Sequence, residues 1–301
     1  MSDLSKYCGV IPAFYACYDD NGEISPQRTR ALAQYLVDQG VQGLYVGGSS
    51  GECIYQSVEE RKLILENVMA QVKGQAVIIA HVACNNTADS QALAAHAESL
   101  GVDAIASIPP IYFHLPEHGI AQYWNDISAA APSTDFIIYN IPQLAGVALT
   151  PSLLREMKKN PRVIGVKNSS MPAQDIQMWR DEGLIVFNGP DEQFISGLVM
   201  GACGGIGGTY AVMPKLFLKA REHLCAGRVE EARQIQNEIC RIIYAMCAAH
   251  GNLYAVMKAI LKKWGVEAGG VRKPLPGLAE SDRAVVDACA EQIQAAVAKY
   301  C

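Results

Sequence analysis

One lysine stands at the end of an apolar run, in the stretch "VIGVKNSS" that spans residues 163–170. A fully buried lysine is rare in proteins unless it is paired, so Lys167 either marks the surface or is kept inside for a chemical purpose. A desolvated lysine favours its neutral form, and a neutral amine attacks a carbonyl carbon to give a Schiff base. Lys167 is therefore the leading candidate nucleophile, with a solvated strand end as the alternative.

Four further groups of polar or glycine residues follow short apolar runs; they are "GGSSGE" (47–52), "YNIP" (139–142), "GPDE" (189–192) and "GGIGGT" (204–209). In the first group, glycines allow backbone N–H groups and the hydroxyls of Ser49 and Ser50 to converge on a small carboxylate. The same stretch could also be only a flexible turn.

The other polar residues also have purely structural alternatives. Tyr139 could line a core with its hydroxyl bonded internally. Asp191 could cap the helix that follows it, and Glu192 could favour the positive end of that helix. The glycines of 204–208 could reflect close packing or a phosphate cradle, although no basic residue stands nearby to support a phosphate site.

Eight short apolar runs alternate with amphipathic stretches, which predicts strands at 9–15, 43–46, 77–81, 104–108, 136–140, 163–166, 185–187 and 204–206. Helix starts are marked by Ser25 before a proline, by a capping box of Ser57 and Glu60, and by Thr150 before a proline. This alternation predicts a closed (β/α)8 TIM barrel, an α/β fold, in preference to an open doubly wound sheet. Active sites of such barrels lie at the carboxyl ends of the strands, where the polar groups collect.

Beyond Lys215 the pattern changes, because residues 230–248, 252–264 and 281–300 all read as helices with no strand between them. We therefore expect a catalytic barrel over residues 1–224 and a helical carboxyl-terminal extension, packed on that barrel, over residues 225–301.

Composition excludes several classes of function. The formal net charge is −5 and no basic stripe is present, so nucleic acid is not an expected partner. No secretory signal and no apolar stretch of about 20 residues is seen, so we expect no membrane association and a cytoplasmic location. The ten cysteines and six histidines are scattered without metal-ligand spacing, and we expect no metal site.

Together, the lysine and the G-[ST]-[ST]-G-E and Y-N-x-P motifs are highly specific. With them the chain resembles the class I, Schiff-base-forming pyruvate aldolases, the family that includes dihydrodipicolinate synthase and N-acetylneuraminate lyase. The resemblance covers nearly the whole chain, from "GVIPAF" at residue 9 to "RKP" at residue 272. It implies the same barrel, no cofactor, and small-molecule substrates: pyruvate and a sugar or aldehyde.

The resemblance also implies roles for individual residues. Lys167 would form an imine with the keto carbon of pyruvate, and Tyr139 would shuttle the proton, since a phenol both donates and accepts. Ser49 and Ser50, with the backbone from Gly48 onward, would hold the pyruvate carboxylate. Tyr112 matches a tyrosine that reaches into the site of a neighbouring subunit, so a homotetramer is implied.

The choice of aldehyde partner depends on other positions. Dihydrodipicolinate synthases carry an arginine shortly after the Y-N-x-P proline, whereas this chain reads "QLAGV" there. The sequence is more similar to N-acetylneuraminate lyase in this stretch and in "GPDE", where Gly189, Asp191 and Glu192 would bind sugar hydroxyls. Ser169 matches a threonine of the lyases that contacts substrate.

Two positions depart from the lyase pattern: Gly208 stands where a serine is usual, and Ser50 where a threonine is common. Cleavage of N-acetylneuraminate is the predicted reaction. Dihydrodipicolinate synthesis, an aldolase for another 2-keto-3-deoxy sugar acid, and a non-catalytic sensor of keto acids are the alternatives.

Overall fold

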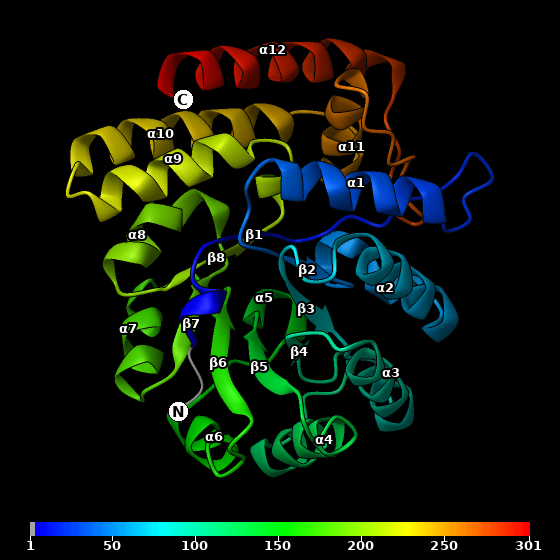
Figure 1. The fold of residues 1–301 in the computed structure, drawn as a ribbon, viewed down its shortest axis with the longest axis vertical. Coiled ribbons are helices and arrows are strands. Elements are labelled where there is room, and N and C mark those ends of the chain that lie inside the picture. The colour runs from blue at the N-terminus through cyan, green and yellow to red at the C-terminus, as the bar shows by residue number, and fades with distance from the viewer. Residues whose placement is uncertain (1–3) are drawn as a thin grey trace.

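The structure is a computed structural model that describes residues 4–301. Eight parallel strands form one sheet in the order β1-β8-β7-β6-β5-β4-β3-β2. The sheet closes because the N–H of Phe14, just after β1, donates to the carbonyl of Tyr45 in β2 at 2.9 Å. Helices surround the strands (Figure 1). The predicted (β/α)8 barrel with carboxyl-terminal helices is confirmed.

The strands of the barrel are β1 Val10–Pro12, β2 Gly43–Val46, β3 Val77–His81, β4 Ala104–Ser107, β5 Asp135–Asn140, β6 Val163–Asn168, β7 Ile185–Asn188 and β8 Gly204–Gly207. The α-helices are α1 Pro26–Asp38, α2 Val58–Val72, α3 Thr87–Leu100, α4 Glu117–Ala129, α5 Pro142–Ala145, α6 Pro151–Met157, α7 Gln174–Asp181, α8 Phe194–Val199, α9 Pro214–Cys225, α10 Val229–Met246, α11 Leu253–Lys263 and α12 Arg283–Tyr300. Short 3-10 turns are η1 Leu4–Tyr7, η2 Ser49–Gly51, η3 Cys53–Tyr55, η4 Asp191–Gln193, η5 Thr209–Ala211 and η6 Glu280–Asp282.

Local sequence sets where several helices begin. Ser25 and Thr150 cap α1 and α6 by accepting a backbone N–H bond in the first turn, and each is followed by proline. Ser57 and Glu60 form the capping box of α2 in both directions. These three helix starts confirm the predictions made from the sequence.

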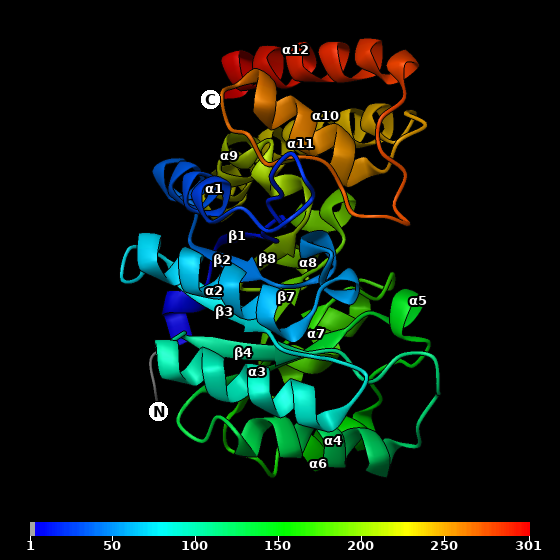
Figure 2. The ribbon, with the colours of Figure 1, turned by 90° about the vertical axis from the view of Figure 1, so that its right-hand side faces the viewer.

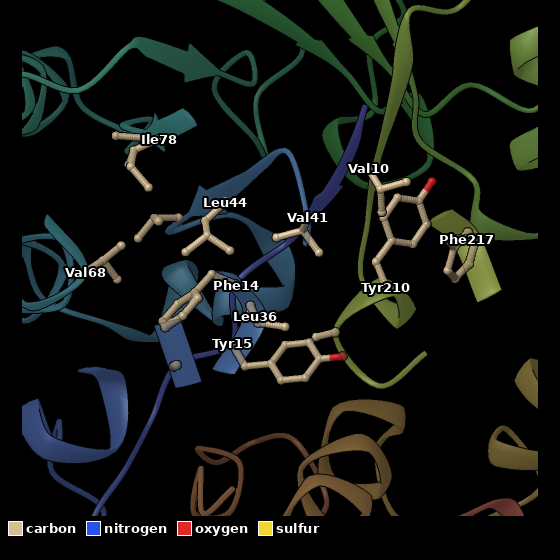
Figure 3. Packing of buried hydrophobic residues seen from close by; sticks show 14 of the residues in the cluster. Val10, Phe14, Tyr15, Leu36, Val41, Leu44, Val68, Ile78, Tyr210 and Phe217 are labelled. Carbon is tan, nitrogen blue, oxygen red and sulfur yellow. The ribbon is translucent and has the colours of Figure 1, made fainter. Parts of the chain in front are cut away.

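Two apolar clusters make the core. The smaller one fills the barrel interior and includes Ile11, Ile79 and Phe187. The larger lies between the barrel and its helices and includes Leu36 of α1 and Leu44 of β2 (Figure 3). Burying each such side chain stabilises the fold by roughly 1.5–3 kcal/mol, and this packing fixes the barrel frame on which the site is built.

The helices α10, α11 and α12 lie together at one end of the molecule (Figures 1 and 2). They join the same apolar cluster as the barrel helices, with Ile239 of α10 and Ile260 of α11 fully buried in it. The expected division falls between residues 224 and 225, whereas α9 runs on to Cys225. The three helices share an apolar cluster with the barrel helices, and the division of the chain into two domains at this point stays a prediction.

Two strands differ from the sequence prediction by more than one residue at an end. β1 was expected over 9–15 but ends at Pro12, because Ala13 bonds to β8 and Phe14 to β2, so regular pairing with one neighbour stops there. β6 continues past the expected end at 166 to Asn168. Lys167 therefore lies inside a buried strand, and the interpretation of a solvated strand end is wrong.

Candidate active site

Lys167 and Tyr139 are register partners on the neighbouring strands β6 and β5, which places both side chains at the same height in the barrel. Their relative exposures are 4% and 3%. The Lys167 Nζ lies 3.9 Å from the centroid of the Tyr139 ring and 4.2 Å from that of Tyr45. Burial lowers the pKa of Lys167 to about 7, with the negative charge of Asp191 opposing the shift. A large fraction of this amine is therefore neutral near pH 7.

The Tyr139 hydroxyl meets the two serine hydroxyls predicted to accompany it. Burial raises the pKa of Tyr139 to about 12, and hydrogen bonds with Ser49 and Ser169 oppose that rise. The phenol thus stays protonated at neutral pH and is joined to hydroxyls on two sides. Such a group can pass a proton to or from a substrate without leaving its place.

The stretch after β2 folds as the 3-10 turn η2, Ser49–Gly51. The N–H groups of Gly51 and Glu52 bond within the turn, to Gly48 and Ser49 carbonyls at 3.0 Å. The first amides of a helical turn have no intrahelical acceptor, so those of Ser49 and Ser50 remain for a ligand. These amides and the two hydroxyls make up the carboxylate cradle, as we call it below.

Asp191 is buried and held by Thr209. Its Oδ2 accepts both the backbone N–H and the Oγ1 hydroxyl of Thr209, at 2.7 and 2.6 Å. Burial raises the pKa of Asp191 to about 6, against the effect of these two bonds. Pro190 and Gln193 are the amino-terminal caps of η4 and α8, so the alternative that Asp191 caps the following helix is wrong. Glu192 is exposed at the rim of the same cavity.

The glycines of the site make room for neighbouring hydroxyls. A Cβ at Gly189 would come within 2.0 Å of the Ser169 Oγ, and one at Gly208 within 2.9 Å of the Ser50 Oγ. Where the lyase pattern has a serine, at Gly208, Tyr254 lies next to the site and hydrogen-bonds Ser50. A tyrosine hydroxyl thus stands near the position of the missing serine hydroxyl.

A cavity of about 340 Å³ opens at the carboxyl ends of the strands. Of the predicted site residues, Ser49, Ser50, Tyr139, Lys167, Ser169, Gly189, Asp191, Glu192 and Gly208 all line it. Pocket-forming residues that the sequence did not predict include Gln143 and Leu144 of α5, Ile243 of α10 with Cys247 just after it, and Tyr254 and Met257 of α11. The amphipathic pattern of α10 and α11 could have shown that they pack, but not that they reach the barrel mouth.

Two predicted residues do not line the cavity. Gly48 lies behind it, where a Cβ would meet the Tyr45 ring at 2.6 Å, so its contribution is to the backbone of the turn. Tyr112 lies in the loop between β4 and α4 with a relative exposure of 86% and a positive φ of 79°. It borders a different hollow, with Asn85 and Gln122, and its predicted role toward a neighbouring subunit stays a prediction.

Within residues 4–301, no group of three or more histidine, cysteine, aspartate or glutamate side chains could hold a metal ion. The described part of the chain also has no helix long and apolar enough to cross a membrane.

Comparison with known proteins agrees with this geometry. The model of the dihydrodipicolinate synthetase family matches residues 6–293. An N-acetylneuraminate lyase of Mediterraneibacter gnavus is 64% identical over 304 residues, which cover 100% of this chain and 96% of that protein. The solved structure of wild-type Ruminococcus gnavus sialic acid aldolase has a TM-score of 0.98 at 64% identity, covering 98% of this chain and 100% of its own. A catalytic lysine mutant of that aldolase has a TM-score of 0.99 at 64% identity, covering 100% of both chains. The chain therefore belongs to the dihydrodipicolinate synthetase family.

Proposed function

We propose that this protein is a class I aldolase that reversibly cleaves N-acetylneuraminate to N-acetylmannosamine and pyruvate. The observation that carries the proposal is the buried Lys167, whose pKa is lowered to about 7, beside Tyr139 and the carboxylate cradle. Full-length relatives that are 64% identical and named N-acetylneuraminate lyase and sialic acid aldolase support the choice of substrate.

In the cleavage direction, the neutral Lys167 amine attacks the C2 keto carbon of the open-chain sugar acid, and loss of water leaves a protonated imine. The departing water takes up the proton of the Tyr139 hydroxyl, and the phenolate left behind accepts the proton of the C4 hydroxyl, directly or through Ser49. The C3–C4 bond then breaks, and its electron pair moves into the imine to give an enamine and the aldehyde of N-acetylmannosamine. The Tyr139 hydroxyl then returns this proton to C3 of the enamine, and hydrolysis of the imine releases pyruvate. The covalent imine serves as the electron sink, so the proposal includes no metal or other cofactor.

The polar groups around Lys167 suit this substrate. The carboxylate cradle would accept the C1 carboxylate through the amides and hydroxyls of Ser49 and Ser50. Asp191 and Glu192 would accept hydrogen bonds from the sugar hydroxyls, which charged acceptors bind strongly. Ser169 and the backbone at Gly189 and Gly208 complete the proposed substrate contacts.

Borohydride reduction in the presence of pyruvate, followed by peptide mass analysis, tests the chemistry. We expect one adduct on Lys167, and its absence would contradict the Schiff-base mechanism. A non-catalytic keto-acid sensor would bind pyruvate without turnover and without proton exchange at the pyruvate methyl group.

A substrate screen tests the specificity. N-acetylneuraminate, 2-keto-3-deoxygluconate, and pyruvate with aspartate semialdehyde are compared side by side. We expect the first to be turned over fastest, because the 143–147 stretch offers no arginine for a second carboxylate. A higher rate with either other substrate would replace our assignment by that aldolase or by dihydrodipicolinate synthase.

We also propose that the active form is a homotetramer in which Tyr112 enters the site of a neighbouring subunit. The exposed Tyr112 ring, packed against Phe113 with centroids 5.0 Å apart, supports this proposal. Sedimentation and mixing of Tyr112→Phe with Lys167→Met subunits would test it: activity should return in the mixture. The cytoplasmic location stays an expectation from the sequence, which cell fractionation can check.

A further inference from the structure

Glu52, the last residue of the "GGSSGE" motif, has a backbone conformation that is uncommon for a residue with a side chain. Its φ and ψ are 57° and 29°, in the left-handed region. Its N–H donates to the Ser49 carbonyl at 3.0 Å, so Glu52 ends the turn that carries the cradle. Such conformations persist only where the surrounding structure enforces them, which raises the question of what holds Glu52.

The Glu52 carboxylate is held by groups from the carboxyl-terminal part of the chain. Its Oε1 accepts the Lys258 Nζ at 2.7 Å, and both side chains have 0% exposure. Its Oε2 accepts the backbone N–H of Arg272 at 2.7 Å and the Tyr18 hydroxyl at 3.3 Å. Lys258 lies in α11, 206 residues from Glu52 in sequence, and also donates to the Gly270 carbonyl at 2.6 Å.

The ion pair lies directly behind the cradle and is not a separate stabilising contact elsewhere in the fold. Gln56 links the two, because its Nε2 donates to the Gly51 carbonyl at 2.8 Å and to the Tyr18 hydroxyl at 3.2 Å. Tyr254, one turn before Lys258 on α11, hydrogen-bonds Ser50. The same helix therefore contacts the cradle at Ser50 and the end of the turn that carries it at Glu52.

A buried ion pair is by itself weak evidence for stability, because desolvating two charges costs about as much as their attraction returns. Well-packed apolar side chains could replace this pair without loss of fold. Because the ion pair lies directly behind the cradle, we expect it to fix the geometry of the turn, as residues that support a ligand site from behind do.

We propose that Lys258 is a positioning residue for the aldolase reaction: through Glu52 it holds the carboxylate cradle in the conformation that binds the substrate carboxylate. This inference rests on the proposed function, since it assigns the cradle to the carboxylate of pyruvate and of the sugar acid. It also makes α11 part of the active site, with Tyr254 and Met257 lining the cavity and Lys258 behind it.

The test measures the apparent affinity with which two ketones form an imine with Lys167. The probes are pyruvate, which has a carboxylate, and methyl pyruvate, whose ester is uncharged. For each, the concentration that gives half-maximal borohydride trapping on Lys167 is determined in the wild type and in Lys258→Met, Glu52→Gln, the double variant and Lys258→Arg. Melting temperatures are recorded alongside, and trapping is normalised to the folded fraction.

The Glu52→Gln/Lys258→Met double variant leaves no unpaired charge. We expect its half-maximal pyruvate concentration to rise by about 10-fold or more, because small displacements of a binding group are costly. Methyl pyruvate should shift by less than about 2-fold, since its ester makes little use of the cradle. Lys258→Arg, which keeps the charge, should recover most of the pyruvate affinity lost in Lys258→Met. Glu52→Asp keeps both charges but shortens the acidic side chain by one methylene group. If the double variant does not fold, this variant takes its place, and its half-maximal pyruvate concentration should also rise.

Tyr7→Phe is the matched control, because the Tyr7 hydroxyl bonds Asp135 and the Asp103 carbonyl at the opposite end of the barrel. It should lower the melting temperature and leave both trapping curves unchanged. The inference is overturned if the Glu52 and Lys258 variants lower the melting temperature yet keep the wild-type value for pyruvate, or if both ketones shift equally. No trapping on Lys167 in the wild type would instead reject the proposed function, and the inference with it.

Discussion

Two lysines of this chain are almost completely buried, and their surroundings assign them opposite tasks. Lys167 in β6 has tyrosine rings beside its Nζ, at 3.9 and 4.2 Å from the ring centroids. Lys258 in α11 has a carboxylate at 2.7 Å and a carbonyl at 2.6 Å. Burial lowers the pKa of both, but Glu52 opposes the shift at Lys258 through its charge and a direct hydrogen bond. The partner, and not burial, separates a nucleophile from a structural cation.

The largest expected effect comes from replacing Lys167 by methionine. Removing the nucleophile should reduce the cleavage rate by at least about 10⁴-fold, because the remaining groups cannot form the imine. The measurement is the turnover of N-acetylneuraminate, with borohydride trapping as a second readout. Residual cleavage within about 10-fold of the wild type would contradict the assignment of Lys167.

The same variant should be more stable than the wild type at pH 7. The Lys167 pKa is about 7 in the folded state and ordinary when unfolded, so the unfolded chain binds more protons between about pH 7 and pH 10.5. This lysine thus lowers the free energy of unfolding most at and below pH 7, and hardly at all above pH 10.5. Urea unfolding at pH 7 and pH 10 should show the gain of Lys167→Met shrinking as pH rises.

Replacing Tyr139 by phenylalanine tests the proton-transfer group while leaving the Lys167 nucleophile in place. The ring stays beside Lys167, but the hydroxyl that contacts Ser49 and Ser169 is lost. We expect kcat to fall by about 10²–10⁴-fold, the usual worth of a positioned proton-transfer group. Trapping by pyruvate should fall less than cleavage, because imine formation does not require the C4 proton to move.

Lys258→Met should show the opposite pattern to Lys167→Met in stability. It leaves the Glu52 carboxylate buried without its cation, which costs about 3–5 kcal/mol of unfolding free energy. Urea unfolding at pH 7 measures this loss. If Lys167→Met lost more stability than Lys258→Met, the division of tasks between the two lysines would be wrong.

The smallest effect is a pH dependence specific to Lys167. Since its neutral form is the nucleophile, the initial rate of trapping at fixed pyruvate should rise by about 10-fold per pH unit below pH 7 and level off above it. Asp191→Asn should shift this profile slightly toward lower pH, because Asp191 opposes the lowering of the Lys167 pKa. A midpoint near pH 10 would show that Lys167 is not desolvated in the free enzyme.

Much of the barrel was predictable because each strand is a short apolar run and each helix carries its own cap. The exact ends of the strands were harder to predict. β6 extends two residues beyond its apolar run, because the buried Lys167 and Asn168 also belong to the strand. The site residues that follow the strands were also found, because the fold class places every such end at one face. Tyr254 and Met257 were missed because nothing local shows where a helix near the carboxyl terminus will dock.

The sequence by itself determined the fold class, the position of the candidate nucleophile and the absence of an arginine after "YNIP", because these depend on short-range patterns and residue types. Only the tertiary structure decided that Lys167 is buried beside aromatic rings, that Asp191 is held by Thr209, and that Lys258 pairs with Glu52 across 206 residues. Those facts depend on which distant surfaces pack together, and an amphipathic pattern specifies that a face will be buried without specifying its partner.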